Sequence, residues 1–271
     1  MSSGIFKVRE DITVLKLGGR LLEDDDFISE VADAVLDRRR QGRKTVLAHG
    51  GGTAITLLAE RLGIESRFVN GIRVTDEKTI EMLLMQLAGV ENKRLVSKLC
   101  SLGVDAVGIG GVDGCCLRAK KMAPVGGVEV GMVGKPVKFE PELIMALLKS
   151  DFTPVFYGLG VSERDEVLNI NADQSAMALA IGIGAGQLIF CSDVDGVLDA
   201  DDNVISTVGG LLFEHGLDDG SIGGSMKVKI EAGLQFFNKT KAYAWIVGKR
   251  GAIQILKGER EAIVGTKVGE S

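Results

Sequence analysis

Apolar positions along the chain follow two periods, and the two periods alternate. Residues 12–17 and 45–48 form short apolar runs rich in β-branched side chains, which are typical of buried strands. Each run is followed by a glycine-rich turn and then by apolar residues three or four positions apart, which indicates a helix packed along one face. The chain therefore begins with two strand–turn–helix units.

The same alternation continues to the end of the chain. Further strands are predicted at residues 105–109, 154–157, 188–191 and 242–247. Strands that alternate with helices predict an α/β fold, a three-layer αβα sandwich around a mainly parallel, open sheet. No linker rich in proline or serine divides the chain, so we expect two lobes (1–166 and 167–271) that share one sheet.

Local signals refine this outline. Asp76 is placed to cap a helix through residues 80–87, and a separate helix is expected at residues 95–99. Pro141 is expected to open another helix. Residues 125–139 interleave apolar residues with glycine and polar residues, which favours a β-hairpin that could act as a flap.

Composition excludes several classes of protein. With 271 residues, 45% of them hydrophobic, the chain can bury a core without disulfides, and its four cysteines lack the spacing of a metal site. The net charge of -5 argues against a nucleic-acid partner, and the basic run at residues 38–44 is interpreted as the solvated end of a helix. There is no apolar run of membrane-spanning length and no secretory signal, so we expect a cytoplasmic location.

Three familiar motifs are incomplete. The Walker pattern is absent, and residues 108–113 lack the last small residue of the dinucleotide fingerprint. Residues 49–52 (HGGG) are similar to an esterase oxyanion loop, but the sequence has no GxSxG nucleophile elbow. A P-loop enzyme, a dinucleotide-binding enzyme and a serine hydrolase are therefore all disfavoured.

Several polar residues nevertheless lie where a parallel sheet binds ligands. Consecutive glycine N–H groups between a strand and a helix form a site for an anion. Lys16 precedes the first glycine turn by two residues, and Asn169 and Asp173 belong to a cluster at a predicted helix start. Taken alone, the lysine fits a snorkelling residue and the cluster fits a helix cap. Three further cations fit solvated side chains equally well: Arg73, Lys227 and Lys229.

Taken in order, seven segments form a more specific pattern. Residues 70–75 (NGIRVT) and 169–174 (NINADQ) are the most specific of them. The others are residues 15–19, 48–52, 87–93 and 192–197, and the pair Met226 and Lys229. Together they cover nearly the whole chain and resemble the amino acid kinase superfamily, and within it most closely the acetylglutamate kinase group.

This resemblance implies an enzyme that transfers the γ-phosphoryl group of ATP to the side-chain carboxylate of N-acetyl-L-glutamate, on the arginine pathway. ATP and Mg²⁺ are the cofactors it implies. A carboxylate is already a nucleophile at neutral pH, so a chain with two histidines needs no dedicated base. Catalysis then depends on alignment and on charge neutralisation.

The resemblance also implies roles for individual residues. Lys16 and Lys229 would contact the transferred phosphoryl group from opposite sides, while Asp173 holds both ammonium groups in place. Arg73 would clamp the α-carboxylate of the acceptor, and Asn169 would bind the same substrate. Two glycine turns complete the site: Gly18, Gly19, Gly50 and Gly51 would present N–H groups to the phosphates, and Gly51 with Gly52 would line the acceptor pocket.

The implied nucleotide site lies on the second lobe, and the hairpin at residues 127–138 would be the lid of the acceptor pocket on the first. No carboxylate is assigned to the metal, so Mg²⁺ would be held mainly by ATP and water. The nucleotide-binding residues implied are Asp193, Val194, Asp195, Gly196, Val197, Leu198, Ser221, Ile222 and Gly223.

The chain departs from the superfamily pattern at two places. Ser225 stands where a glycine is usual, and residues 110–116 match only loosely. Two alternatives therefore stay open: a kinase for an acetylated or carrier-protein-bound aminoadipate or glutamate, as in lysine-type pathways, or a non-catalytic nucleotide-binding sensor.

The expected partners are small-molecule substrates, with no nucleic acid and no membrane. Only about ten residues precede the first strand, whereas arginine-inhibited hexameric members carry an extra helix there. We therefore expect a homodimer without arginine feedback.

Overall fold

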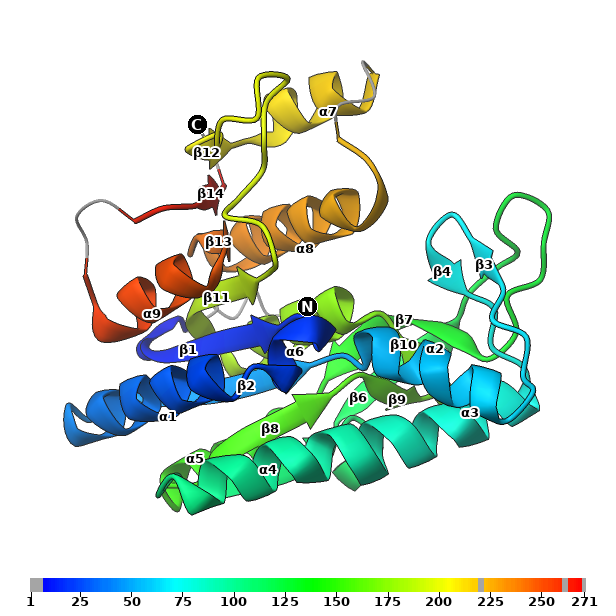
Figure 1. Cartoon of the computed structure of the whole chain (residues 1–271), viewed down its shortest axis with the longest axis horizontal. Helices are drawn as coiled ribbons and strands as arrows, with labels where there is room; N and C mark the ends of the chain where they lie inside the picture. Colours follow the sequence, from blue (N-terminus) through cyan, green and yellow to red (C-terminus); the bar gives the residue numbers. More distant parts are fainter. Residues whose placement is uncertain (1–6, 219–221, 260–262, 270–271) are drawn as a thin grey trace.

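The computed structural model describes residues 7–218, 222–259 and 263–269, and one large sheet forms its centre (Figure 1). The strands of this sheet are β1 (Arg9–Leu17), β2 (Lys44–His49), β5 (Ala106–Gly110), β8 (Thr153–Tyr157), β11 (Ala185–Cys191), β12 (Thr207–Val208), β13 (Ala244–Val247) and β14 (Thr266–Val268). Across the sheet they lie in the order β12, β14, β13, β11, β1, β2, β8, β5.

The middle of the sheet is parallel. β1 pairs in parallel with β11 on one side and with β2 on the other, and β8, β5 and β13 continue in the same direction. Only β14 runs antiparallel to its neighbour β13, and β12 follows β14. The prediction of a mainly parallel sheet is confirmed, and β1 and β11 join the two halves of the chain within it.

Helices cover both faces of the sheet. One face carries α1 (Asp25–Arg40), α4 (Asn92–Ser101) and α9 (Lys249–Lys257). The other carries α5 (Glu142–Lys149), α6 (Ala172–Ile183) and α8 (Gly224–Thr240). Successive strand residues point to opposite faces, so Val14 packs toward α6 and Leu15 toward α1, and both are fully buried. Within the described ranges, no helix is long and apolar enough to cross a membrane.

Four short strands close into a small barrel beside the main sheet. They are β6 (Leu117–Lys121), β7 (Val133–Phe139), β9 (Leu159–Val161) and β10 (Val167–Ile170). β6 and β7 pair antiparallel, so the predicted hairpin is real, but it begins earlier than expected and residues 122–132 are its connection. Near the end of that connection, Gly131 bridges Thr75.

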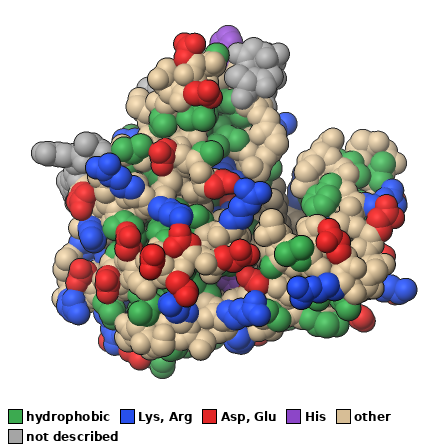
Figure 2. Space-filling view, in the orientation of Figure 1, with side chains coloured by type: hydrophobic (Ala, Val, Ile, Leu, Met, Phe, Trp, Pro, Cys, Tyr) green, Lys and Arg blue, Asp and Glu red, His purple; other side chains and the backbone are tan. Residues whose placement is uncertain are grey.

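A two-stranded ribbon forms the projection next to that connection. Its strands are β3 (Phe68–Val69) and β4 (Ile72–Arg73), and Figure 1 shows the ribbon standing beside the loop between β6 and β7. The space-filling view shows a hollow between this projection and the part of the molecule that carries α7 (Gly210–Asp218) (Figure 2). The main sheet therefore supports two separate prominences with a depression between them.

The helix predicted from Asp76 and the helix predicted at residues 95–99 are continuous. The Asp76 carboxylate accepts from the Thr79 N–H at 2.8 Å, so the predicted cap of α3 (Glu77–Leu83) is confirmed. A π-helical segment, η2 (Leu84–Glu91), then leads directly into α4. Because a π turn adds a residue without ending the helix, spacing alone gave two helices instead of one.

The basic run at residues 38–44 is not uniformly solvated, so that interpretation was wrong for Arg38. Its side chain is 2% exposed and lies beneath the sheet. The guanidinium donates to the Thr13 hydroxyl at 2.6 Å, the Thr45 hydroxyl at 3.1 Å and the Leu256 carbonyl at 3.3 Å. Burial of a guanidinium is tolerated here because its donors are satisfied by strands and α9.

Candidate active site

The strand alternation of β1 places Lys16 on the face of the sheet that α6 covers. Lys16 lies two residues after Val14, and the strand period is two, so both side chains point the same way. The lysine is 6% exposed, which is unusual for an ammonium group unless it is paired. The sequence reading of an isolated snorkelling lysine therefore does not describe its environment.

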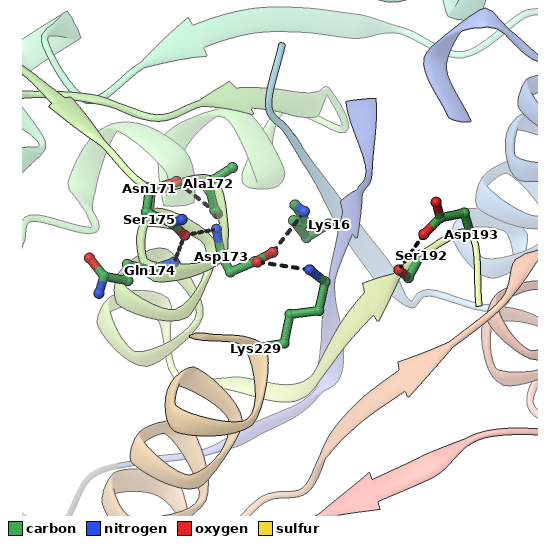
Figure 3. Close-up of polar contacts among 9 residues, drawn as sticks. All are labelled: Lys16, Asn171, Ala172, Asp173, Gln174, Ser175, Ser192, Asp193 and Lys229. Atoms are coloured by element: carbon green, nitrogen blue, oxygen red, sulfur yellow. Dashed lines mark hydrogen bonds and ion pairs between the residues drawn. The ribbon is translucent and has the colours of Figure 1, made fainter. Parts of the chain in front are cut away.

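The partner of Lys16 comes from the start of α6. The Asn171 side chain caps that helix by accepting from the backbone N–H groups of Asp173 and Gln174, at 2.9 and 3.2 Å. The cap leaves the Asp173 carboxylate directed toward the sheet, where one oxygen lies 2.7 Å from the Lys16 Nζ. Figure 3 shows this carboxylate between two lysines.

The second lysine of the site is Lys229, on α8. Its Nζ lies 3.3 Å from the other Asp173 oxygen, and its residue is 7% exposed. Lys227, two positions earlier, faces away and pairs on the surface with Glu231 at 4.0 Å. The structure thus brings Lys16, Asp173 and Lys229 together and leaves Lys227 outside.

Charge balance decides the protonation of Asp173. Burial alone would raise the pKa of its carboxyl, but the attraction of Lys16 and Lys229, with their hydrogen bonds, outweighs burial and lowers the pKa below its usual value near 3.8. The carboxylate is therefore ionised at neutral pH. Two ammonium groups and one carboxylate leave a net positive charge in a buried site, which favours an anionic ligand.

Two glycine turns meet beside this centre. A Cβ on Gly19 would lie 2.5 Å from the Cα of Gly52, and Gly52 has a φ of +46°, so neither position has room for an ordinary side chain. Gly18 donates its N–H to the Cys191 carbonyl at 3.1 Å, which ties the first turn to the end of β11. A Cβ on Gly50 would lie 3.1 Å from the Cβ of Ala172, next to Asp173.

Arg73 lies on the ribbon. It is far from Lys16 and Lys229 along the sequence, but the ribbon stands above the same end of the sheet. Its two terminal nitrogens donate to the Ser66 hydroxyl at 2.7 Å and the Thr56 hydroxyl at 2.9 Å. Its guanidinium also lies over the Phe68 ring, 4.6 Å from the ring centre. All three partners are uncharged, and burial lowers the pKa of Arg73. Among the described residues, Arg73 forms no ion pair.

The residues that hold Arg73 were missed by the sequence analysis, although one signal was available. Asn70 and Gly71 both have positive φ, of 48° and 77°, which is the two-residue hairpin turn that Asn-Gly favours. That turn pairs Phe68 with Arg73 across the ribbon. Thr56 and Ser66 carry no comparable signal, because only the folded chain brings them to the guanidinium.

Asn169 connects the small barrel to the ribbon. Its amide Nδ2 donates to the Thr75 hydroxyl at 3.1 Å, and the Thr75 hydroxyl donates to the Arg73 carbonyl at 2.9 Å. The Asn169 backbone N–H donates to the Met132 carbonyl, beside the connection of the hairpin. Asn169 and Arg73 therefore lie on one hydrogen-bonded path at the outer end of the site.

The loop after β11 contains six of the residues expected to bind a nucleotide. Four of them are exposed: Asp193, Val194, Asp195 and Leu198. Gly196 and Val197 are buried, and the Val197 N–H donates to the Thr266 hydroxyl at 2.8 Å, which anchors the loop on β14. Ser192 and Asp193 lie at the end of β11, where the Ser192 hydroxyl donates to the Asp193 carboxylate at 3.1 Å (Figure 3).

The remaining three expected nucleotide residues precede α8. Ser221 lies outside the described residues. Ile222 is buried, and Gly223 is exposed and stands at the N-cap of α8 with an extended backbone. Ser225, which replaces the usual glycine, is exposed in the first turn of α8, while Gly224 beside it has a φ of +55°.

The described residues contain no group of three or more His, Cys, Asp and Glu side chains arranged to hold a metal ion. Asp173, the buried carboxylate of the centre, has each of its oxygens facing a lysine.

Known proteins are similar to this chain over most of its length. The model of the amino acid kinase family matches residues 11–248. The acetylglutamate kinase of Methanopyrus kandleri is 40% identical over 225 residues, which cover 81% of this chain and 87% of the relative. That of Rhodospirillum centenum is 34% identical over 266 residues, 94% of this chain and 87% of the relative. The crystal structure of smu.665 from Streptococcus mutans UA159 has a TM-score of 0.82 at 25% identity, and the match covers 97% of this chain and 100% of that one.

Proposed function

The chain belongs to the amino acid kinase family, and from that premise we propose that it transfers the γ-phosphoryl group of ATP to the side-chain carboxylate of N-acetyl-L-glutamate. The product is N-acetyl-L-glutamyl 5-phosphate, an intermediate of arginine biosynthesis. Relatives named acetylglutamate kinase, 34% and 40% identical to this chain, support the choice of acceptor. The observation that carries the reaction class is the buried pairing of Lys16 and Lys229 with Asp173.

The two lysines neutralise charge during transfer. The transferred phosphoryl group spreads its charge over three oxygens in the transition state, and two fixed ammonium groups in a buried site match that charge. Asp173 is a positioning residue in this scheme, because each of its oxygens holds one ammonium group. The acceptor carboxylate attacks directly, so the site needs no general base.

The glycine turns supply neutral donors. Gly18, Gly19, Gly50 and Gly51 would direct N–H groups toward the phosphates, and Gly51 with Gly52 would border the acceptor. The close packing of Gly19 on Gly52 supports this role, because it holds the two turns against each other beside the lysine centre.

Arg73 would bind the α-carboxylate of the acceptor. Ser66 and Thr56 use one N–H of each terminal nitrogen, which leaves three N–H groups of the guanidinium for a carboxylate. Asn169 would contact the same substrate from β10, and the connection at residues 122–132 would cover it as a lid. A positive charge with only neutral protein partners is suited to an anionic acceptor.

The nucleotide would bind along Asp193, Val194, Asp195, Gly196, Val197 and Leu198 and near Ser221, Ile222 and Gly223. Mg²⁺ would enter as part of the ATP complex and would be held by phosphate oxygens and water, since the carboxylate of the centre is committed to lysines. When bound, the ion neutralises negative charge on the phosphates.

This assignment divides the chain by task. Residues 1–166 would bind the acyl amino acid and form a homodimer, and residues 167–271 would bind ATP. Within the described chain, β5 is the last strand at its side of the sheet, and an edge strand presents unpaired backbone groups that a second copy can cover. Sedimentation equilibrium tests the dimer, and a monomeric mass would contradict it. We also propose a cytoplasmic location for the enzyme.

The reaction itself is tested by trapping the acyl phosphate with hydroxylamine. The assay contains MgATP and one of four acceptors: N-acetyl-L-glutamate, L-glutamate, N-acetyl-L-aspartate or N-acetyl-L-aminoadipate. We expect a strong hydroxamate signal with N-acetyl-L-glutamate alone. Preference for the aminoadipate would correct the acceptor. Silence with all four, from protein that binds ATP, would overturn the proposal in favour of a carrier-bound acceptor or a sensor.

A further inference from the structure

His49, the last residue of β2, is buried directly beneath the second glycine turn. The residue is 1% exposed, and its Nδ1 lies 3.1 Å from the carbonyl oxygen of the next residue, Gly50. Its Nε2 lies 3.0 Å from the side-chain amide nitrogen of Asn92, the first residue of α4. The imidazole thus connects the glycine turn to the helix on the other side.

The orientation of the Asn92 amide is determined by its other two contacts. Its Nδ2 lies 2.9 Å from the Val155 carbonyl, which can only accept a hydrogen bond. Its Oδ1 lies 3.1 Å from the Lys93 ammonium group, which can only donate. Exchanging the amide oxygen and nitrogen would place like groups together at both contacts. The second N–H of Nδ2 therefore points at His49, and the Nε2 of His49 must accept it.

The neighbouring strand has a glycine where the Asn92 side chain packs against it. Asn92 is 0% exposed. A Cβ on Gly108 of β5 would lie 1.8 Å from the Asn92 Oδ1 and 2.7 Å from the Lys93 Nζ. The π-helical segment ends directly before Asn92, at the point where the helix turns this residue toward the sheet. The contact is therefore built into three elements of the fold.

A neutral imidazole whose Nε2 accepts must carry its proton on Nδ1, which then donates to the Gly50 carbonyl. Burial lowers the pKa of His49 to about 4, and the positive charges of Lys16 and Lys93 act in the same direction. Tyr157 of β8, whose ring centre lies 6.3 Å from that of the imidazole, is uncharged at neutral pH, since burial raises its pKa to about 12. The Gly50 carbonyl acts in the opposite direction and raises the pKa of His49, but burial outweighs it, so the imidazole is neutral at neutral pH.

The direction of the Gly50 carbonyl sets the direction of the next N–H. In a planar trans peptide, the C=O and the following N–H point in opposite directions. Because the imidazole holds the Gly50 carbonyl on the buried side, the Gly51 N–H points away from the imidazole. No backbone carbonyl of the described residues accepts from that N–H.

We propose that His49, fixed as the Nδ1–H tautomer by Asn92, is a positioning residue that orients the Gly50–Gly51 peptide so that its N–H binds a substrate oxygen. The identity of that substrate rests on the function proposed above. The tautomer and its dependence on Asn92 do not, so the two proposals can fail separately.

The spectroscopic test uses protein labelled with ¹⁵N in its histidine rings. The chain has only two histidines, and a His215→Gln control, at an exposed residue of α7, assigns the signals. We expect the Nδ1–H tautomer for His49 throughout about pH 5.5 to 8. In Asn92→Asp an acceptor replaces the donor, and Nε2 should become protonated. An Nε2–H tautomer in the wild type, or no change in Asn92→Asp, would overturn the proposal.

The kinetic test compares two variants that differ in one donor. His49→Leu removes the donor to Gly50, and kcat should fall roughly 10- to 100-fold while ATP affinity changes less than about 3-fold. His49→Asn places an amide N–H near the position of Nδ1 and should recover most of that loss. Full activity in folded His49→Leu, or no recovery in His49→Asn despite equal thermal stability, would overturn the proposal. If the wild type phosphorylates none of the acceptors, only the proposed function fails, and the spectra still decide the tautomer.

Discussion

The proposed phosphoryl-transfer centre and the proposed acceptor end of the site differ in how they stabilise buried charge. At the centre, Lys16, Asp173 and Lys229 are 6%, 4% and 7% exposed, and every charge has a partner of opposite sign. At the acceptor end, Arg73 is half-buried and contacts two hydroxyls and an aromatic ring. The first end contains its own counter-ion, whereas Arg73 has only uncharged partners among the described residues.

The difference follows from what each end has to do. A fully buried ammonium group needs a partner in the free protein, because an unpaired buried charge is costly. Asp173 fills this role without cancelling the positive charge that a phosphoryl group requires. Arg73 remains partly exposed to water, so its charge is tolerated before an anion binds. Ser66, Thr56 and Phe68 fix the orientation of its guanidinium plane. We infer that the centre is organised before substrate arrives and that the acceptor end gains its full stabilisation on binding.

Replacing a lysine of the centre should have the largest effect on catalysis and is the strongest test of this difference between the two ends. We expect Lys16→Ala and Lys229→Ala each to lower kcat by about 10²- to 10³-fold, with the KM for ATP changed only a few-fold, because the charge matters most in the transition state. Steady-state kinetics provide the check. Lys227→Ala is the matched control, since this exposed lysine belongs to the same helix, and it should be almost neutral. Equal losses in kcat and in ATP affinity would contradict the assignment.

Asp173→Asn tests whether the centre depends on its internal counter-ion. Removing one partner from a buried ionic cluster costs about 3–5 kcal/mol in unfolding free energy. The folded pKa of Asp173 lies below its unfolded value near 3.8, so its contribution is complete above that value and is lost as the pH falls through the folded pKa. Urea unfolding should therefore show a constant difference in unfolding free energy between wild type and Asp173→Asn from about pH 7 to pH 5. This difference should narrow below about pH 4. A difference that is absent at neutral pH, or that widens in acid, would contradict the model.

The lysine centre was predicted through the family resemblance, since local patterns alone fitted a snorkelling lysine and a helix cap, but the structure shows that local rules build its parts. Strand alternation directs Lys16 to the face of α6, and the Asn171 cap fixes the start of that helix. Both are properties of a few consecutive residues. The β-α alternation likewise predicted the parallel sheet, because the crossover helices are read from the same periodicity.

The sequence was least informative where distant segments meet. Arg38 looked like a solvated cation, but Thr13 of β1 and the end of α9 satisfy its donors only in the folded chain. The π turn before Asn92 has no sequence rule, so the continuous helix was divided in two. The supports of Arg73 come from α2 (Gly52–Arg61), a loop and β3, and no pattern along the chain joins them.

At the acceptor end, substitution of Arg73 should have a smaller effect than at the centre, and it should weaken acceptor binding rather than lower kcat. Arg73→Ala should raise the KM for N-acetyl-L-glutamate by roughly 10- to 100-fold, as expected for losing one or two charged hydrogen bonds, with kcat changed only a few-fold. Arg73→Lys should recover little, because a point charge cannot replace the planar fork. Arg61→Ala is the control for an exposed arginine of the same region. A fall in kcat with an unchanged acceptor KM would move Arg73 from binding to chemistry.

The smallest expected effect tests whether the Ser66 hydroxyl acts through Arg73. Ser66→Ala removes the partner of one terminal nitrogen, and the acceptor KM should rise by roughly 2- to 12-fold, the value of one ordinary hydrogen bond, while the KM for ATP stays constant. If Ser66 only positions the guanidinium, the same substitution in an Arg73→Ala background should change nothing further, so a double-mutant cycle isolates the coupling. Additive effects would mean that Ser66 contacts the acceptor itself. The acceptor end would then bind its substrate through the Ser66 hydroxyl as well as through Arg73, whose charge has no counter-ion among the described residues.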